Sequence, residues 1–176
     1  MKYLLSFSTM SLLFFTALNC TAQQDKSKRP SPPVTVTQMV GKTTIAINYS
    51  QPSVKGRTIG VDLEPMADKV WRAGANEATV FETDKDVIVE GKTLPKGKYG
   101  FFILVLKESW VLIFNKTWDQ WGAFKYKEAD DVLRVPVKSG KGTAFAEKLT
   151  YKISADGIVT IAWGDMETNF TVQEKK

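Results

Sequence analysis

The sequence predicts an all-β protein, an antiparallel β-sandwich of jelly-roll-like form with two long irregular connections. Three observations support this: apolar or alternating runs recur over residues 34–172, turn residues separate them at short intervals, and an amphipathic helical repeat is missing. Many short strands joined by Gly- and Pro-containing turns are typical of sandwiches and barrels. The expected strands are residues 34–40, 43–50, 77–83, 86–90, 99–106, 109–115, 131–138, 145–154, 158–163 and 168–172.

Residues 1–22 have the three parts of a secretory signal peptide. Lys2 stands near the start, an apolar run ends at Leu18, and small residues follow. Ser and Thr residues interrupt the apolar run, which is also shorter than the ~20 apolar residues that a membrane span requires. We therefore expect an exported protein, periplasmic or extracellular, without a transmembrane segment.

Two processing sites compete at the end of this leader. Cleavage after Ala22 would start the mature chain at Gln23. Lipoprotein processing would instead make Cys20 the acylated first residue and so provide a membrane tether. The sequence favours the first site, because Ala17 and Asn19 fit a lipoprotein signal poorly.

Residues 23–33 are polar, charged and rich in proline, so they are not able to bury an apolar face. They are expected to form a flexible linker, extended or disordered, ahead of a single domain at residues 34–176. A chain of about 150 residues buries roughly 68–70% of its unfolded surface, which is enough for an ordinary hydrophobic core.

The composition excludes several classes of chemistry and partner. The chain has no histidine, and a mature chain that begins at Gln23 has no cysteine. A Ser-His-Asp triad, a Cys-His pair, the usual zinc sites and a disulfide framework are therefore excluded, and no cofactor is expected. The formal net charge of +5 is small and the lysines are dispersed among acidic residues, so nucleic acid is not an expected partner.

The strands are predicted from two different patterns. Residues 44–50 and 148–154 alternate between apolar and polar or small side chains, which predicts strands with one buried and one solvent-facing side. By contrast, residues 101–106 and 110–114 are continuously apolar and aromatic. That pattern predicts a central hairpin buried on both faces.

Turn residues divide the rest of the chain. Gly, Pro and Asp, which supply a positive or a fixed φ, occur between apolar runs at residues 90–92, 95–97, 139–142 and 155–157. Two long stretches keep no strand pattern, residues 51–75 and 116–130. Binding residues tend to lie in such connections between rigid strands.

The first connection runs into the sequence Trp-Arg-Ala-Gly-Ala-Asn-Glu-Ala-Thr, which begins at Trp71 and is the best candidate for a functional site. Arg72 offers a planar fork of donors, and Asn76 and Glu77 add further donors and acceptors. Together with Arg57, Arg72 would bind an anionic group on which Trp71 stacks. In the alternative, Arg72 and Glu77 pair with each other or with neighbours to fasten the loop, and Trp71 plugs the end of the sandwich.

The second connection is unusually rich in aromatic residues, with Trp118, Trp121, Phe124 and Tyr126 close together. Exposed indole rings beside Asp and Gln side chains suit a sugar, whose apolar face packs on the ring. The alternative is that these aromatic side chains cover the open end of the core.

Catalysis by paired carboxylates is the remaining enzymatic possibility, and it requires two carboxylates about 5 to 10 Å apart across one cleft. The acidic residues available are Glu64, Asp68, Glu77, Asp119, Asp130 and Asp131. The adjacent pair at 130 and 131 is typical of a solvated turn. The sequence Asp84-Lys85-Asp86 lacks the glycine and terminal glutamate of a calcium loop, so no metal site is predicted.

Several blocks occur in an order that resembles one bacterial family: residues 49–52 (Tyr-Ser-Gln-Pro), 54–57 (Val-Lys-Gly-Arg), 70–79, 94–99 (Leu-Pro-Lys-Gly-Lys-Tyr), 110–115 and 120–124 (Gln-Trp-Gly-Ala-Phe). They make the chain similar, from about residue 33 to 172, to the family catalogued as domain of unknown function 2911. The resemblance implies an exported protein, often of Bacteroidota, with no established activity or catalytic residue to carry over. Many members carry a basic residue where Gln51 stands, so an anion site that relied on that cation would be weaker here.

Together these observations favour a non-enzymatic ligand-binding or envelope-associated module whose two irregular connections meet near one end. The expected partner is a small molecule or a glycan. The alternative function is a small carboxylate-dependent hydrolase acting on saccharides. The residues expected to line the site are Arg57, Trp71, Arg72, Asn76, Glu77 and Trp121.

Overall fold

The computed structural model describes residues 25–106 and 109–175. The predicted signal peptide at residues 1–22, including Cys20, lies outside these residues. Within the described ranges, none of the helices is long and apolar enough to cross a membrane.

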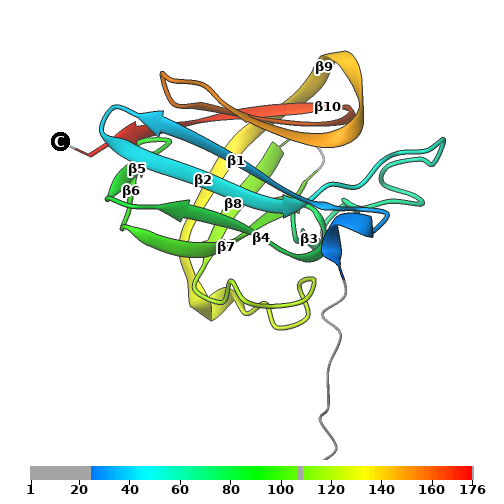
Figure 1. Ribbon diagram of the computed structural model, residues 1–176, viewed down its shortest axis with the longest axis horizontal. Coiled ribbons are helices and arrows are strands. Elements are labelled where there is room, and N and C mark those ends of the chain that lie inside the picture. Colours follow the sequence, from blue (N-terminus) through cyan, green and yellow to red (C-terminus); the bar gives the residue numbers. More distant parts are fainter. Residues whose placement is uncertain (1–24, 107–108, 176) are drawn as a thin grey trace, which may run out of the picture.

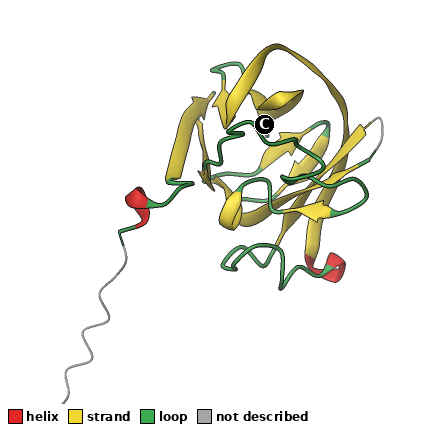
Figure 2. Ribbon diagram, turned by 90° about the vertical axis from the view of Figure 1, so that its right-hand side faces the viewer, coloured by secondary structure: helices red, strands yellow, loops and turns green. Residues whose placement is uncertain are grey.

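The described residues form one large antiparallel sheet (Figure 1), with the two short 3-10 helices lying outside the strands (Figure 2). The strand order is β1-β2-β4-β7-β8-β9-β10-β5-β6, and β3 pairs with β7. The elements are η1 (Lys26–Lys28), β1 (Pro33–Val40), β2 (Thr43–Ser50), β3 (Val70–Trp71), β4 (Ala75–Thr83), β5 (Val87–Val89), β6 (Lys92–Leu94), β7 (Gly97–Val105), β8 (Ser109–Asn115), η2 (Glu128–Asp130), β9 (Asp131–Ile153) and β10 (Ile158–Glu174).

The predicted all-β antiparallel class is confirmed, whereas the separate sheets of a jelly-roll sandwich are not, because one hydrogen-bonded path joins the strands. The sheet curls so far that β1 touches β9 and β10, which lie near the other end of the path. Apolar side chains from both ends of the path therefore meet in one core.

From residue 131 onwards the sequence predicted four short strands, whereas the structure has two long ones, β9 and β10. Their pairing shifts register between Ala162 and Gly164 and again between Gly164 and Met166. Such bulges bend a strand without ending it, so the glycines at 140 and 142, which were interpreted as a turn, lie inside β9. The real turn is at residues 154–157, where Gly157 has a φ of +87°.

The hairpin of β7 and β8 is buried on both faces, as predicted. Phe101 and Phe114 point into the main core, while Phe102 and Ile113 point to the opposite face and belong to a second cluster. Residues 116–130 cover this second face, and the Tyr126 ring lies 5.2 Å from that of Phe102, measured between centroids. For Tyr126, the structure therefore agrees with the alternative in which the aromatic side chains of this connection cover the core.

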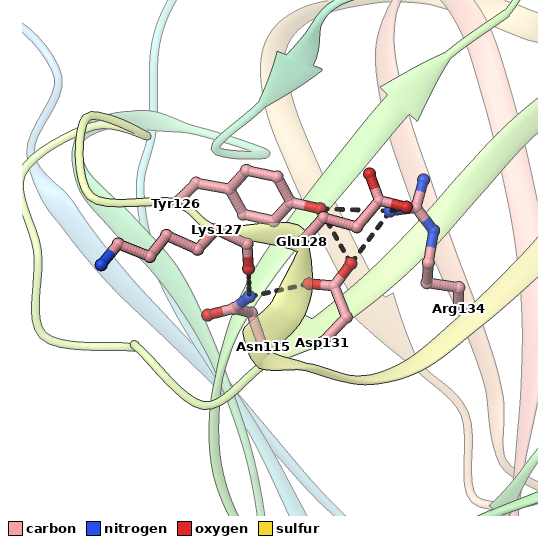
Figure 3. A network of polar contacts seen from close by, with 6 residues as sticks. All are labelled: Asn115, Tyr126, Lys127, Glu128, Asp131 and Arg134. Atoms are coloured by element: carbon pink, nitrogen blue, oxygen red, sulfur yellow. Dashed lines mark hydrogen bonds and ion pairs between the residues drawn. The ribbon is translucent and has the colours of Figure 1, made fainter.

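A polar network fastens this connection to β8 and β9 (Figure 3). The Asp131 carboxylate accepts hydrogen bonds from the Asn115 amide (2.7 Å) and the Tyr126 hydroxyl (2.8 Å), and it pairs with Arg134 at 2.9 Å. Asn115 also donates to the Lys127 carbonyl oxygen at 3.0 Å. The Asp131 side chain is only 5% exposed, so the prediction of a solvated turn at residues 130–131 is wrong for Asp131. The burial supplied by the covering connection decides this, and sequence spacing does not show it.

We expect Asp131→Ala to lower the free energy of unfolding by about 2–3 kcal/mol, because it strips a hydrogen-bonded partner from Arg134, Tyr126 and Asn115. Urea unfolding measures this, with Asp130→Ala as the matched control. An equal, small effect of both substitutions would contradict the assigned role of the network.

Candidate functional site

The turn between β3 and β4 is fixed from several sides. Trp71 is 2% exposed, and its Nε1 donates to the Gly74 carbonyl oxygen at 3.2 Å. The Ala73 carbonyl oxygen accepts hydrogen bonds from Thr79 Oγ1 (2.9 Å) and the Tyr151 hydroxyl (2.7 Å). A Cβ atom at position 74 would lie 2.8 Å from Thr79 Oγ1, so this close approach requires glycine. The positions of the side chains on either side of the turn are thereby determined.

On one side of this turn, Arg72 lines a cavity of about 280 Å³, which we call the Arg72 cavity. Trp71 is one of its lining residues, but a side chain so fully buried has almost no ring face left for the predicted stacking on a ligand. Three of the predicted site residues, Arg57, Trp71 and Arg72, thus line one cavity. The other polar or aromatic side chains in its wall are Ser31, Asp62, Glu64 and Trp163.

Among the described residues, the Arg72 guanidinium is left without an ion-pair partner. Its Nε is buried without a hydrogen-bond acceptor in the same part of the chain. Burial lowers the pKa of Arg72, and the nearby negative charge of Glu64 partly offsets this. Arg57 differs, because its Nε and Nη2 donate to the carbonyl oxygens of Val54 (3.1 Å) and Ser53 (2.8 Å).

The two carboxylates of the cavity are held by the first connection. Asp62 accepts a hydrogen bond from the Thr58 backbone N–H at 2.9 Å, and Glu64 Oε2 accepts one from the Met66 backbone N–H at 2.9 Å. Trp163 Nε1 donates to the Glu64 carbonyl oxygen at 2.9 Å, which ties this loop to β10. The cavity is therefore lined by both cationic and carboxylate side chains.

The remaining predicted residues form a second cluster on the other side of the turn. Glu77 accepts hydrogen bonds from Arg29 Nη1 at both carboxylate oxygens (2.9 and 3.0 Å), and Lys26 Nζ lies 2.9 Å from its Oε1. The Arg29 guanidinium also lies over the Trp121 ring, 5.8 Å from its centroid. Asn76 Nδ2 donates to a backbone carbonyl in the same N-terminal segment, at Ser31 (2.9 Å). Glu77, Asn76 and Trp121 thus have partners in the N-terminal segment of the same chain.

Residues 25–33 therefore contact the domain, where the sequence predicted an extended or disordered linker. Their composition does not allow a buried apolar face, but Lys26 and Arg29 find a carboxylate at Glu77 and an indole at Trp121. Pairing of charges in this way is decided by the tertiary structure, which brings β4 alongside the segment.

The chain matches a family described as a protein of unknown function over residues 31–172. It belongs to the DUF2911 family. The resemblance found in the sequence is thus confirmed. The matched range contains the residues that line the Arg72 cavity and, of the second cluster (the Glu77 cluster), Asn76, Glu77 and Trp121, whereas Lys26 and Arg29 precede it. No curated protein and no solved structure matched the chain.

In this DUF2911 domain the second connection lies directly against the start of β4. The Ala78 N–H donates to the Gln120 carbonyl oxygen and the Gly122 N–H to the Asn76 carbonyl oxygen, both at 2.9 Å. The aromatic side chains of the connection divide accordingly: Tyr126 packs on the sheet, whereas others stay exposed. The exposed ones are Trp118, Trp121 and Phe124.

Of the predicted alternative, an Arg72–Glu77 pair is not found among the described residues, whereas Glu77 does pair with other neighbours, Lys26 and Arg29, and Trp71 is buried. Of the carboxylates considered for catalysis, only Glu64 lines the Arg72 cavity, where its companion is Asp62. The described residues contain no group of three or more side chains suited to hold a metal ion.

Sequence reasoning missed three members of the cavity wall. Trp163 follows Ile161 at the spacing of a strand's buried face, which indicates burial but gives no sign of the cavity. Asp62 was not among the acidic residues considered, and Ser31 lies in the segment interpreted as a linker. No local signal brings these positions together.

The N-terminal segment is expected to loosen when Glu77 loses its charge. Burial alone would raise the pKa of Glu77, but hydrogen bonds from Lys26 and Arg29 outweigh it and lower the pKa from 4.5 to about 2. The contribution to stability is therefore complete above pH 4.5 and disappears as the pH falls towards 2. Because the side chain is 36% exposed, we expect no more than about 1 kcal/mol.

Glu77→Gln should accordingly speed trypsin cleavage after Lys26 and Lys28 at neutral pH. Its difference from the parent chain in urea unfolding should narrow between pH 4.5 and pH 2. Glu82→Gln, which removes another surface ion pair, with Lys98, is the matched control. Identical cleavage of both variants would show that Glu77 does not hold the segment.

Proposed function

We propose that this DUF2911 domain is a non-enzymatic binding module whose Arg72 cavity takes a small ligand through a carboxylate or a similarly planar anionic group. The observation that carries the proposal is that Arg72 lines the cavity with no ion pair to any described residue, and that its Nε is buried without an acceptor there. The expected setting is outside the cytoplasm, following the signal-peptide prediction.

The energetic argument concerns an unpartnered charge. A buried donor without an acceptor costs roughly 1–3 kcal/mol, and more when the group is charged. A ligand carboxylate would accept two parallel N–H bonds from a guanidinium, which is the geometry that Arg provides and Lys does not. Because Nε itself is closed to solvent, the ligand would bind the terminal Nη atoms, and the gain would be a partner for the charge of the guanidinium. Arg57 lines the same cavity and also forms no ion pair with a described residue, so it adds to the positive potential in the cavity.

Binding is favoured over hydrolysis by how the carboxylates are used. A saccharide hydrolase needs two carboxylates free to act on opposite sides of a glycosidic bond. Asp62 and Glu64 are two residues apart on one loop, each held there by a backbone N–H, and are not contributed by opposite walls of the cavity. With Trp71 and Trp163 each at most 2% exposed, the cavity also lacks an open ring face for a sugar.

Thermal unfolding of the full chain with acetate, succinate, citrate, benzoate and the common L-amino acids tests the proposal. A carboxylate at a hundredfold over its Kd should add about 2.7 kcal/mol and raise the midpoint by several degrees. Arg72→Met should abolish the response, whereas Arg29→Met, which removes a paired arginine of the Glu77 cluster, should retain it. A response that survives in Arg72→Met would place binding elsewhere.

Arg72→Met also has a distinctive expected effect without any ligand. Because the substitution removes a partly buried charge that forms no ion pair with a described residue, while keeping the apolar stem, it should leave the free energy of unfolding unchanged or increase it. Urea unfolding measures this. A loss of about 3 kcal/mol or more would show that Arg72 is structural and would overturn the proposal.

A further inference from the structure

The Arg72 cavity carries charges of both signs that do not neutralise each other. Glu64 lies near enough to Arg72 to raise the pKa of the guanidinium, yet the two side chains form no ion pair within 4 Å in the described structure. Two opposite charges in contact would satisfy one another. Held apart across one cavity, each remains able to bind a group of opposite sign.

Glu64 is the better placed of the two carboxylates to receive a cation. It is partly buried, whereas Asp62 is exposed. Trp163 donates to its backbone carbonyl oxygen and so holds the backbone, and the Met66 backbone N–H donates to its Oε2 and so orients the carboxylate. Its Oε1 accepts no hydrogen bond from the residues that the structure describes. A fixed carboxylate with one free oxygen is an acceptor for an ammonium group.

From this arrangement we infer that the ligand is zwitterionic: a free amino acid whose carboxylate binds Arg72 and whose ammonium group binds Glu64. This inference rests on the proposed function. It adds the second charge to the ligand and assigns a residue to it, since a simple carboxylate would leave Glu64 without a partner.

Size and lining restrict the ligand further. The cavity volume of about 280 Å³ lies just below the roughly 300–1,000 Å³ typical of pockets for drug-sized ligands. This size favours a single amino acid over a longer peptide. Its uncharged wall includes the partly exposed residues Pro52, Leu63 and Ala75. An apolar side chain such as that of leucine or phenylalanine would face this surface.

The test changes the ligand before it changes the protein. Isothermal titration of the full chain with L-leucine and L-phenylalanine is compared with their N-acetyl derivatives, which lack the ammonium group, and their amides, which lack the carboxylate. We expect each blocked form to bind at least tenfold more weakly than the free amino acid. This comparison uses the unaltered chain, so it does not depend on the folding of a variant.

Glu64→Gln then assigns the second charge. It should weaken binding of the free amino acid at least tenfold and leave the N-acetyl derivative unchanged, while Arg72→Met weakens both. Asp62→Asn is the matched control, because it neutralises the other carboxylate of the cavity and should have the smaller effect. Thermal unfolding of each variant checks that it folds.

The outcomes separate the two proposals. Equal binding of free and N-acetyl amino acids, or binding of acetate or succinate with no response to the amino acids, would overturn the zwitterion and leave the carboxylate site standing. Binding of the free amino acid that ignores Glu64→Gln would also overturn it. If neither amino acids nor simple carboxylates bind, both the inference and the proposed function fail.

Discussion

The Ala73 carbonyl oxygen is the constraint on which the arrangement of both clusters depends. It accepts hydrogen bonds from Thr79 in β4 and from Tyr151 in β9, so a single backbone atom ties the turn after β3 to two strands. Gly74 makes this possible, because a side chain there would collide with Thr79. Buried hydroxyl-to-carbonyl bonds of this kind specify one loop conformation, since any other leaves polar atoms unpaired.

From this fixed turn the polar side chains diverge. Arg72 precedes the turn and lines a cavity with the first connection, whereas Glu77 follows it and binds the N-terminal segment. Ser31 connects the two regions, because its carbonyl oxygen accepts from Asn76 while the residue itself lines the cavity. The motif that begins at Trp71 therefore has two parts. Glu77 pairs with cations of the chain, whereas Arg72 forms no ion pair with a described residue.

Much of the fold could be predicted from local patterns, and the errors have physical causes. The β7–β8 hairpin was predictable because continuous apolar runs permit burial on both faces. The last strands were divided wrongly because glycine weakens a strand without ending it, and bulges let β9 and β10 continue. Within the site, the importance of Arg72 and Glu77 was predictable from their chemistry, but their partners were not. Lys26 and Arg29 come from a segment whose composition indicates only that it has no apolar face.

The sequence by itself determined the all-β class, the absence of histidine-dependent chemistry and the stretch in which the candidate site is found. These follow from side-chain types and from the two-residue period of strands, which are local properties. Only the tertiary structure decided that Trp71 is buried and does not offer a ring face for stacking, that Glu77 pairs with the chain's own cations, and that Arg72 and Glu64 share a cavity without forming an ion pair. Those outcomes depend on which distant segments the curled sheet brings together. Burial, which sets how strongly two charges interact, exists only after the chain has folded.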